Sequence, residues 1–383
     1  MTELALKGIN KQNSASFDFS AGEGRKRIIS SLLDLSLLGL EAMYLPGEGL
    51  FCHRRILTGN GMKNEGASVR YTIITLLGLG KAQRCGFKVP FDVQRITERL
   101  LDRAASFDST GDLGLLLWLV AQALPDRIDL LIQGANIRRA LKQSREVQKG
   151  LTTELSWLLS GLCQVKEALG KEKPEMAGLA AEVYALVCAN YGGRGIFRHM
   201  GRGTLAGQLR GRFGCFADQV YPIEAFSNFW RVYGDPGALK IAQECADMIC
   251  RLQGRLGQWW WQYDATSGRV IGRYPVYSVH QDGMAPMALF AIGSASGQDY
   301  GGPIYKGLEW ITGRNELGVN LVAERERMIW RSFYQGKTRK YAEAALSLAQ
   351  LHFPARGFEG LMILQECRPY HLGWLLYAFA DKI

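Results

Sequence analysis

The sequence lacks the short motifs that mark many nucleotide-dependent and triad enzymes. Its 383 residues contain no Walker loop, no GxGxxG after a strand, no HExxH helix and no GxSxG elbow. Nucleotide-dependent and triad chemistry are therefore disfavoured. Histidine is scarce, with five residues, and no clear metal-binding set is visible. We therefore expect neither a metal nor a cofactor.

Cysteine is present without the spacing of a redox or metal site. None of the eight cysteines forms a CxxC pair, and most lie in apolar helical patterns, where the thiol packs as a small hydrophobic group. Every apolar run is interrupted before the roughly 18 residues that a transmembrane helix needs, so none is expected. The first 20 residues lack the basic and apolar regions of a signal peptide. These features favour reduced thiols in a cytoplasmic protein.

Negative charge is in the minority, and the formal net charge is +10. Such a balance fits an anionic substrate or surface, but also a basic surface that is simply solvated. No nucleic-acid-binding motif accompanies it, so no nucleic-acid partner is expected. The densest basic stretch, residues 198–214, contains four arginines among glycines and predicts a loop that could clamp a carboxylate or phosphate.

The most informative feature is a repeated type of helix. Six glycine-rich apolar segments open on polar residues, at 68–79, 111–121, 152–162, 221–230, 277–291 and 366–379. Amphipathic segments alternate with them, at 25–45, 90–107, 126–144, 174–193, 235–254 and 301–318. Six inner and six outer helices predict an all-α (α/α)6 toroid, with 21–383 as one domain and 1–20 as a flexible segment. An alternating stretch predicts a short β-hairpin insertion near 317–334, followed by another helix from Arg339.

Glycine–aromatic turns precede three of the inner segments, at Gly47, Gly193 and Gly257. Glycine permits the positive φ of a tight turn, and we expect the following aromatic ring to plug the helical layer. The polar openings of the inner helices would then meet at one end of the toroid, which we call the mouth. Ionisable groups above an apolar cup are typical of a catalytic or binding funnel.

Four residues are candidate acid/base groups. Glu224 lies among apolar neighbours on an inner helix, where a carboxylate must be paired or have a raised pKa. His280 and Asp282 open another inner helix, although a lone histidine is often a satisfied structural group. Asp264 belongs to the same aromatic-rich stretch, but it could equally cap the turn "DATSG".

The remaining candidates would bind substrate. Aromatic side chains can stack on sugar rings, although the tryptophans could also be structural plugs, and each buried arginine could answer either a protein carboxylate or a substrate anion. Asp112 and Glu154 could be helix caps instead. The predicted binding residues are Arg70, Asp112, Glu154, Tyr221, Trp259, Trp260, Trp261, Tyr263, Tyr277, Arg368, Tyr370 and His371.

The helical repeats resemble the α/α-toroid superfamilies over residues 25–383. One is the six-hairpin glycosidase-like group, with its glycoside and uronyl hydrolases, polysaccharide lyases and sugar epimerases. The other is the terpenoid cyclase and protein prenyltransferase group. "QGRLGQW" from Gln253 fits the triterpene cyclase repeat once, but the DxDD acid motif and the prenyltransferase zinc set are missing.

The resemblance, together with the polar openings, implies a carbohydrate-active hydrolase, lyase or epimerase. Its substrate would be a small molecule or oligosaccharide, anionic or uronate-containing, and its chemistry general acid/base catalysis. The alternatives are a terpenoid cyclase or isomerase using the same cavity, and a non-catalytic toroid that binds a glycan or a protein.

Overall fold

The computed structural model describes residues 22–134, 151–170, 174–201, 211–335 and 360–383, with Ile137 and Leu141. The predicted flexible segment 1–20, the predicted helix from Arg339 and most of the arginine-rich loop lie outside these residues. Among the described residues, no helix is both long and apolar enough to span a membrane. All eight cysteines are described, and each carries a free thiol.

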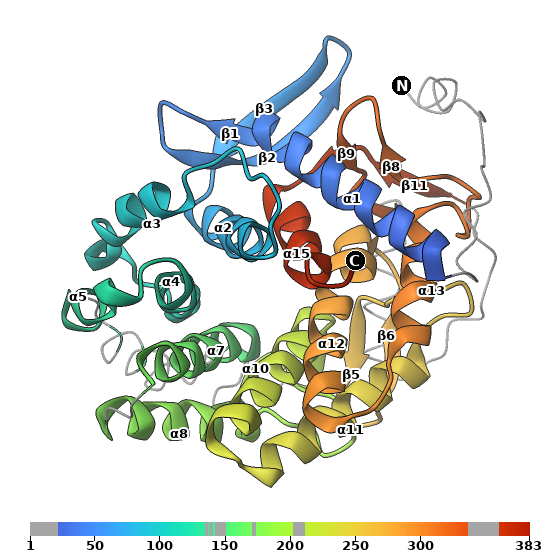
Figure 1. Ribbon diagram of the computed structural model, residues 1–383. Helices are drawn as coiled ribbons and strands as arrows, with labels where there is room; N and C mark the ends of the chain where they lie inside the picture. Colours follow the sequence, from blue (N-terminus) through green and yellow to red (C-terminus); the bar gives the residue numbers. More distant parts are fainter. Residues whose placement is uncertain are drawn as a thin grey trace.

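Two layers of helices form a closed ring (Figure 1). Each inner helix contacts the next, and the last returns to the first. The inner helices are α2 (Val69–Arg84), α4 (Thr110–Ala123), α7 (Thr152–Leu169), α10 (Ala217–Tyr233), α12 (Ala285–Ser296) and α15 (Pro369–Phe379). The outer layer contains α1 (Gly22–Met43), α3 (Val93–Leu101), α5 (Ile128–Gly134), α8 (Pro174–Ala189), α11 (Pro236–Leu252) and α13 (Gly301–Ile311), with the short turns η1 (Ala104–Ser106) and η2 (Pro125–Arg127) between α3 and α5. The predicted toroid is confirmed.

The two layers differ in burial as their sequences predict. Helix α4 is buried on nearly every face, from Leu113 to Ala121. Helix α11 buries one stripe, formed by Ala238, Ala242, Cys245, Ala246 and Ile249. An all-round apolar helix belongs inside a core, whereas a one-sided stripe belongs on its outer shell.

Glycines let the inner helices approach one another closely. A Cβ atom on Gly161 of α7 would lie 2.3 Å from the carbonyl oxygen of Gly114 of α4. A Cβ on Gly78 of α2 would lie 2.0 Å from the carbonyl oxygen of Gly373 of α15. Since a real Cβ is not found at such distances, these helix pairs pack backbone against backbone, which explains why the inner segments are rich in glycine.

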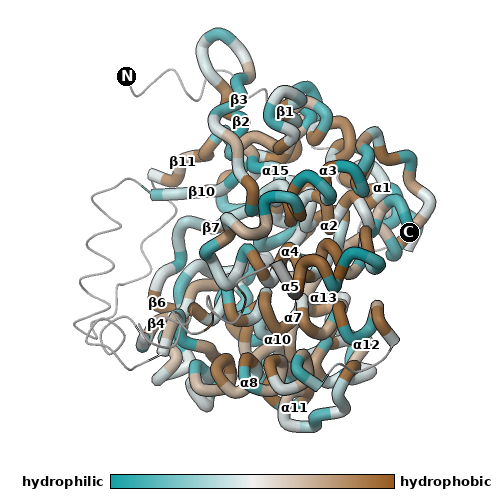
Figure 2. The backbone as a smooth tube through the Cα atoms, turned by 90° about the vertical axis from the view of Figure 1, so that its left-hand side faces the viewer, coloured by the Kyte–Doolittle hydropathy of each residue, from teal (hydrophilic) through white to brown (hydrophobic). Residues whose placement is uncertain are grey.

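Short strands gather at one side of the toroid, as the side view shows (Figure 2). Every strand pair among the described residues is antiparallel. One sheet contains β1 (Tyr44–Leu45), β2 (Leu50–Thr58), β3 (Gly61–Ala67) and β12 (Glu366–Cys367). A second contains β7 (Val276–Tyr277), β10 (Ser332–Gln335) and β11 (Leu361–Leu364), and a third β4 (Phe213–Cys215), β5 (Gln262–Asp264) and β6 (Arg269–Gly272). Helices α2, α10 and α15 each begin within two residues of a strand, so this side is the mouth.

The predicted hairpin near 317–334 is present as β8 (Val322–Ala323) paired with β9 (Met328–Ile329). A longer hairpin that was not predicted is formed by β2 and β3, of nine and seven residues. Thr58 pairs with Gly61 across a two-residue loop, Gly59–Asn60. Gly–Asn between β-prone residues is a recognised hairpin signal, so the information was in the sequence.

The glycine–aromatic turns behave as predicted. Gly49, Gly195 and Gly257 have φ angles of 67°, 70° and 103°. The aromatic rings that follow, Phe51, Phe197 and Trp259, are fully buried. Each turn therefore closes the helical layer beneath it with an aromatic plug.

Candidate active site

Three inner helices bring a charged cluster together at the mouth. Arg70, Asp112 and Glu154 lie in the first turns of α2, α4 and α7. The guanidinium of Arg70 donates to Asp112 through Nε and to Glu154 through Nη2, the latter at 3.3 Å. Ser109, which caps α4, lies 3.0 Å from Arg70 Nη2 and 3.3 Å from Glu154 Oε1. The two carboxylates flank one arginine, so the cluster carries a net negative charge.

This cluster is open to solvent on one side and aromatic on another. The side chains of Asp112 and Glu154 are each 23% exposed, and that of Arg70 is 34% exposed. The guanidinium also lies over the ring of Trp157, 5.4 Å from its centroid. Partly exposed carboxylates beside a flat apolar ring can both contact a polar ligand and exchange protons with it.

A second cluster, of tyrosines and arginines, adjoins the first through Tyr71, the residue after Arg70. Arg368, the N-cap of α15, donates to the hydroxyl of Tyr71 at 2.6 Å, and the ring of Tyr370 lies 4.6 Å from that of Tyr71. Arg331 lies over the ring of Tyr277 at 4.9 Å. We call these five residues the Tyr–Arg cluster.

Positive charge exceeds negative charge around this cluster. Arg54, Arg331 and Arg368 each lie 3.2 Å from one carboxylate, that of Glu366. Arg54 has a second partner in Glu65. The three arginines thus exceed their two carboxylate partners by one charge, so this part of the mouth attracts an anionic group.

His280 lies beneath this cluster in a π-helical turn, η3 (His280–Met284). Its ring packs against Phe216 at 4.6 Å and Tyr277 at 5.1 Å. Burial, together with the charge of Arg331, lowers the pKa of His280 to about 3, so the imidazole is neutral at neutral pH. Its Nδ1 has no hydrogen-bond partner among the described residues. Single π-helical turns inside α-helices are frequent at functional sites.

Asp282 and His371 form a buried pair rather than an open acid/base site. His371 Nε2 lies 2.8 Å from both carboxylate oxygens of Asp282. Burial alone would lower the pKa of His371, but Asp282 outweighs it and raises that pKa to about 9. The pair joins η3 to α15 inside the ring, which is a structural role.

Glu224 lies one helical turn beyond Tyr221, away from the mouth. Its carboxylate accepts a hydrogen bond from Ser160 at 2.6 Å and another from Asn228. Burial raises the pKa of Glu224 to about 7, against these two hydrogen bonds. The charge of Arg231, in the last turn of α10, also acts on Glu224 and lowers its pKa slightly against the effect of burial. The structure therefore does not bring Glu224 to the Arg70 or Arg368 clusters.

Asp264 takes the structural position that the turn "DATSG" allows. Its oxygens lie 3.0 and 2.6 Å from Arg212 and accept from the backbone of Thr266 and the hydroxyl of Ser267. Although partial burial opposes it, Arg212 and these donors lower the pKa of Asp264. This side chain fixes a turn and a strand pair.

The predicted aromatic residues divide between the core and the mouth. Trp259, Tyr263 and Tyr221 are buried, and Trp374 donates to the hydroxyl of Tyr221 at 3.0 Å. Trp260 is half-buried beside Tyr274. Trp261 is half-buried and meets Tyr277 edge to face at 6.2 Å. Of the three tryptophans, Trp261 therefore contacts the Tyr–Arg cluster.

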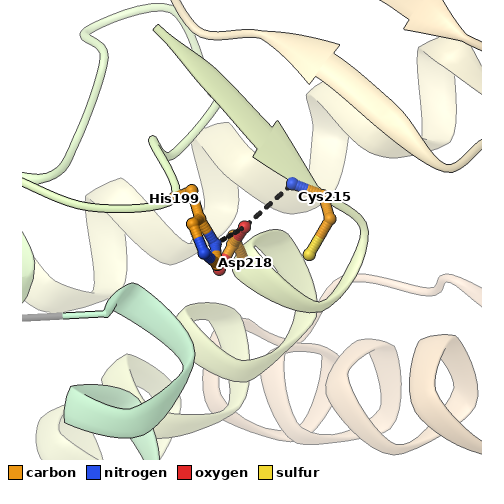
Figure 3. Close-up of side chains that lie close together, drawn as sticks. All are labelled: His199, Cys215 and Asp218. Atoms are coloured by element: carbon orange, nitrogen blue, oxygen red, sulfur yellow. Dashed lines mark hydrogen bonds and ion pairs between the residues drawn. The ribbon is translucent and has the colours of Figure 1, made fainter. Parts of the chain in front are cut away.

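Sequence reasoning missed a cluster at the start of α10 (Figure 3). The buried carboxylate of Asp218 accepts from Thr153 Oγ1 at 2.9 Å and from the backbone of Cys215 at 2.8 Å. His199 Nδ1 lies 3.0 Å from the same carboxylate. Asp218, Arg331 and Tyr71 are not among the predicted site residues. No fixed spacing links these residues, so nothing in the sequence could have paired them.

No protein-family model matches the chain, and comparison with curated protein sequences gives no match. Solved structures do match. An unsaturated glucuronyl hydrolase specific for heparin has a TM-score of 0.60 at 16% identity, over 92% of this chain and 95% of that one. The unsaturated glucuronyl hydrolase of Bacillus sp. GL1 has a TM-score of 0.57 at 15% identity, over 92% of this chain and 95% of that one. A sugar epimerase from a ruminal bacterium has a TM-score of 0.61 at 11% identity, over 93% of this chain and 98% of that one. The chain shares the α/α-toroid fold of these proteins.

Proposed function

We propose that this protein is a carbohydrate-active enzyme that uses Asp112 and Glu154 at the mouth as its acid/base pair. One observation carries the proposal: two partly exposed carboxylates from adjacent inner helices flank Arg70. Paired carboxylates are the groups with which most glycosidases protonate a leaving group and stabilise or hydrate the sugar. The guanidinium of Arg70 holds both carboxylates in place through its hydrogen bonds, so that they face one site.

The substrate class follows from the charge of the neighbouring cluster. Arg331 and Arg368 share one glutamate at the mouth, and Tyr71, Tyr277 and Tyr370 supply ring faces and hydroxyls. A uronate or another anionic sugar offers a carboxylate for arginine and ring C–H groups for aromatic faces. The names of the similar structures, glucuronyl hydrolases and a sugar epimerase, support a sugar substrate.

The four residues first proposed as catalytic have less suitable surroundings. Asp264, Asp282 and Glu224 are each 3% exposed or less, and their carboxylates accept hydrogen bonds inside the protein. Asp112 and Glu154 are held by Arg70 but remain open to solvent. His280 remains a candidate for lining the substrate site from below. A polyene pocket would be mostly apolar, so the charged mouth favours a sugar over a terpenoid.

Turnover of uronate-containing and neutral oligosaccharides tests the proposal. We expect Asp112→Asn and Glu154→Gln each to lower kcat at least about 100-fold, the usual range for loss of a general acid or base. Glu167→Gln is the matched control, because Glu167 lies on the same helix but pairs with Arg231 at its far end. Full activity of both mouth variants, with the fold intact, would disprove the assignment. Analysis of the product distinguishes hydrolysis, elimination and epimerisation.

A further inference from the structure

The cluster of His199, Cys215 and Asp218 has the composition of a transition-metal site. An imidazole nitrogen, a thiol sulfur and a carboxylate oxygen converge there, all within 4.8 Å of one another (Figure 3). We propose that these three residues bind one divalent ion of the zinc class. This inference does not depend on the proposed sugar chemistry. It differs from the expectation from the sequence, which is that the protein binds no metal.

The donor atoms select the type of ion. Nitrogen and sulfur donors favour Zn²⁺ and similar transition metals, whereas Ca²⁺ and Mg²⁺ prefer oxygen donors. Three protein ligands also leave one tetrahedral position for water or a ligand oxygen, as in catalytic rather than structural zinc sites. The site would therefore be an open one.

The distances are close to those that a common ion needs. His199 Nδ1 and Asp218 Oδ2 are 3.0 Å apart, and two such ligands of one tetrahedral zinc lie about 3.3 Å apart. These two atoms now share a hydrogen bond, and the ion would bind to both of them in its place. Binding replaces the shared proton, and the thiol must also lose its proton and move toward the ion.

The backbone around the cluster is held in place. His199 donates its N–H to Phe213 at 2.8 Å and accepts from the N–H of Thr152 at 3.0 Å. Residues 213–215 belong to β4, which pairs with β5, and Asp218 lies in the first turn of α10. Ligands on such fixed elements are preorganised for binding.

Both the outer partners and the access suit an ion. The buried carboxylate of Asp218 is oriented by Thr153 Oγ1 and by the backbone of Cys215, the kind of outer contact that positions metal ligands. The His199 side chain is 42% exposed, so solvent reaches the cluster from one side. Thr153 directly precedes Glu154, which places the proposed ion beside the mouth.

Titration of the purified full chain with Co²⁺ and Zn²⁺ tests the site. We expect one ion per chain and, with Co²⁺, a thiolate-to-metal absorption band in the near ultraviolet. Cys215→Ser should abolish the band, and His199→Gln should weaken Zn²⁺ binding by at least about 100-fold, the upper end of the effect of losing an outer partner. Thr153→Val should weaken it by about 10–100-fold.

Cys85→Ser is the matched control, because Cys85 is an exposed thiol at the end of α2. It should keep both the band and the affinity. The side chain of His199 is partly exposed, so His199→Gln remains informative even if Cys215→Ser prevents folding. No stoichiometric ion in the wild-type chain, or a band that survives in Cys215→Ser, would overturn the proposal and leave the cluster as a hydrogen-bonded support of α10.

Discussion

At the scale of single residues, carboxylates on the inner helices differ in burial and in their partners. Glu224 and the mouth carboxylates Asp112 and Glu154 all lie on inner helices. Glu224 is 3% exposed and has only neutral hydrogen-bond donors, so burial raises its pKa to about 7. The mouth carboxylates are in contact with solvent and with Arg70. Position along an inner helix therefore decides whether a carboxylate meets solvent and an arginine or only buried neutral groups.

Glu224→Gln should change the pH dependence of stability. The folded-state pKa of Glu224 is about 7 and the ordinary value is 4.5, so the native state binds the extra proton between these two pH values. Its free energy of unfolding should therefore fall as pH rises through this window. In the wild type this fall should amount to about 3 kcal/mol, and in the variant it should be absent. Urea unfolding at several pH values measures it, and the exposed Glu98→Gln should behave as wild type.

Asp282→Asn should be strongly destabilising, because it leaves His371 buried without its counter-charge. We expect a loss of about 3–5 kcal/mol in the free energy of unfolding. The folded pKa of His371, about 9, exceeds its ordinary 6.5. The pair's contribution is therefore complete below pH 6.5 and is lost as pH rises through 9, and the variant should not show this loss. Breaking the exposed Arg231–Glu167 pair should cost about 1 kcal/mol or less. Equal effects of the two substitutions would contradict the assignment.

At the scale of elements, glycine sets the spacing of the inner helices. A Cβ on Gly114 would lie 2.4 Å from the Cα of Leu158 on α7, so alanine there must push α4 and α7 apart. Gly178, on the outer helix α8, has no atom within 4 Å of the corresponding position. Two glycines in helices therefore predict opposite effects of the same substitution.

Gly114→Ala should destabilise the protein by about 1–3 kcal/mol, the usual cost of overpacking. Gly178→Ala should stabilise it by about 0.5–1 kcal/mol, since alanine is the better helix former and no contact opposes it. Denaturant midpoints of both variants measure the difference. A stabilising Gly114→Ala would show that α4 and α7 are not packed backbone to backbone.

At the scale of the whole molecule, α15 closes the ring. It contacts α2, α12 and α1, and its buried Trp374 lies 5.9 Å from Trp118 of α4 and bonds Tyr221 of α10. One side chain thus ties together three inner helices that are far apart in the sequence. We infer that the described helices of the ring unfold as one unit.

Trp374→Ala should test this inference. We expect a loss of about 3–5 kcal/mol, with the tryptophan fluorescence and far-ultraviolet dichroism transitions moving together, as for a two-state unit. The buried Trp310 in α13, changed to phenylalanine, serves as a milder control. Separate transitions for the two probes would instead divide the chain into independent units.

The sequence by itself determined the architecture. Three local features predicted the helices: the spacing of apolar residues, the alternation of fully apolar with one-sided segments, and the polar residues that begin the inner segments. The structure contains the inner and outer helices that these features predict. It also placed Arg70, Asp112, Glu154 and Arg368 at the mouth, because the first residues of inner helices must lie there. It missed the β2–β3 hairpin, although its Gly59–Asn60 turn is a local signal.

Only the tertiary structure decided how these groups are paired. Asp264 pairs with Arg212, Asp282 pairs with His371, and Glu224 accepts a hydrogen bond from Ser160. The two members of each pair are 52 or more residues apart in the sequence. His199 contacts Asp218, which lies 19 residues further along the chain. Periodicity fixes which face of a helix is buried, but the register between neighbouring helices fixes which side chains meet. That register depends on backbone contacts such as those of Gly114 and Gly161, which no single segment of sequence contains.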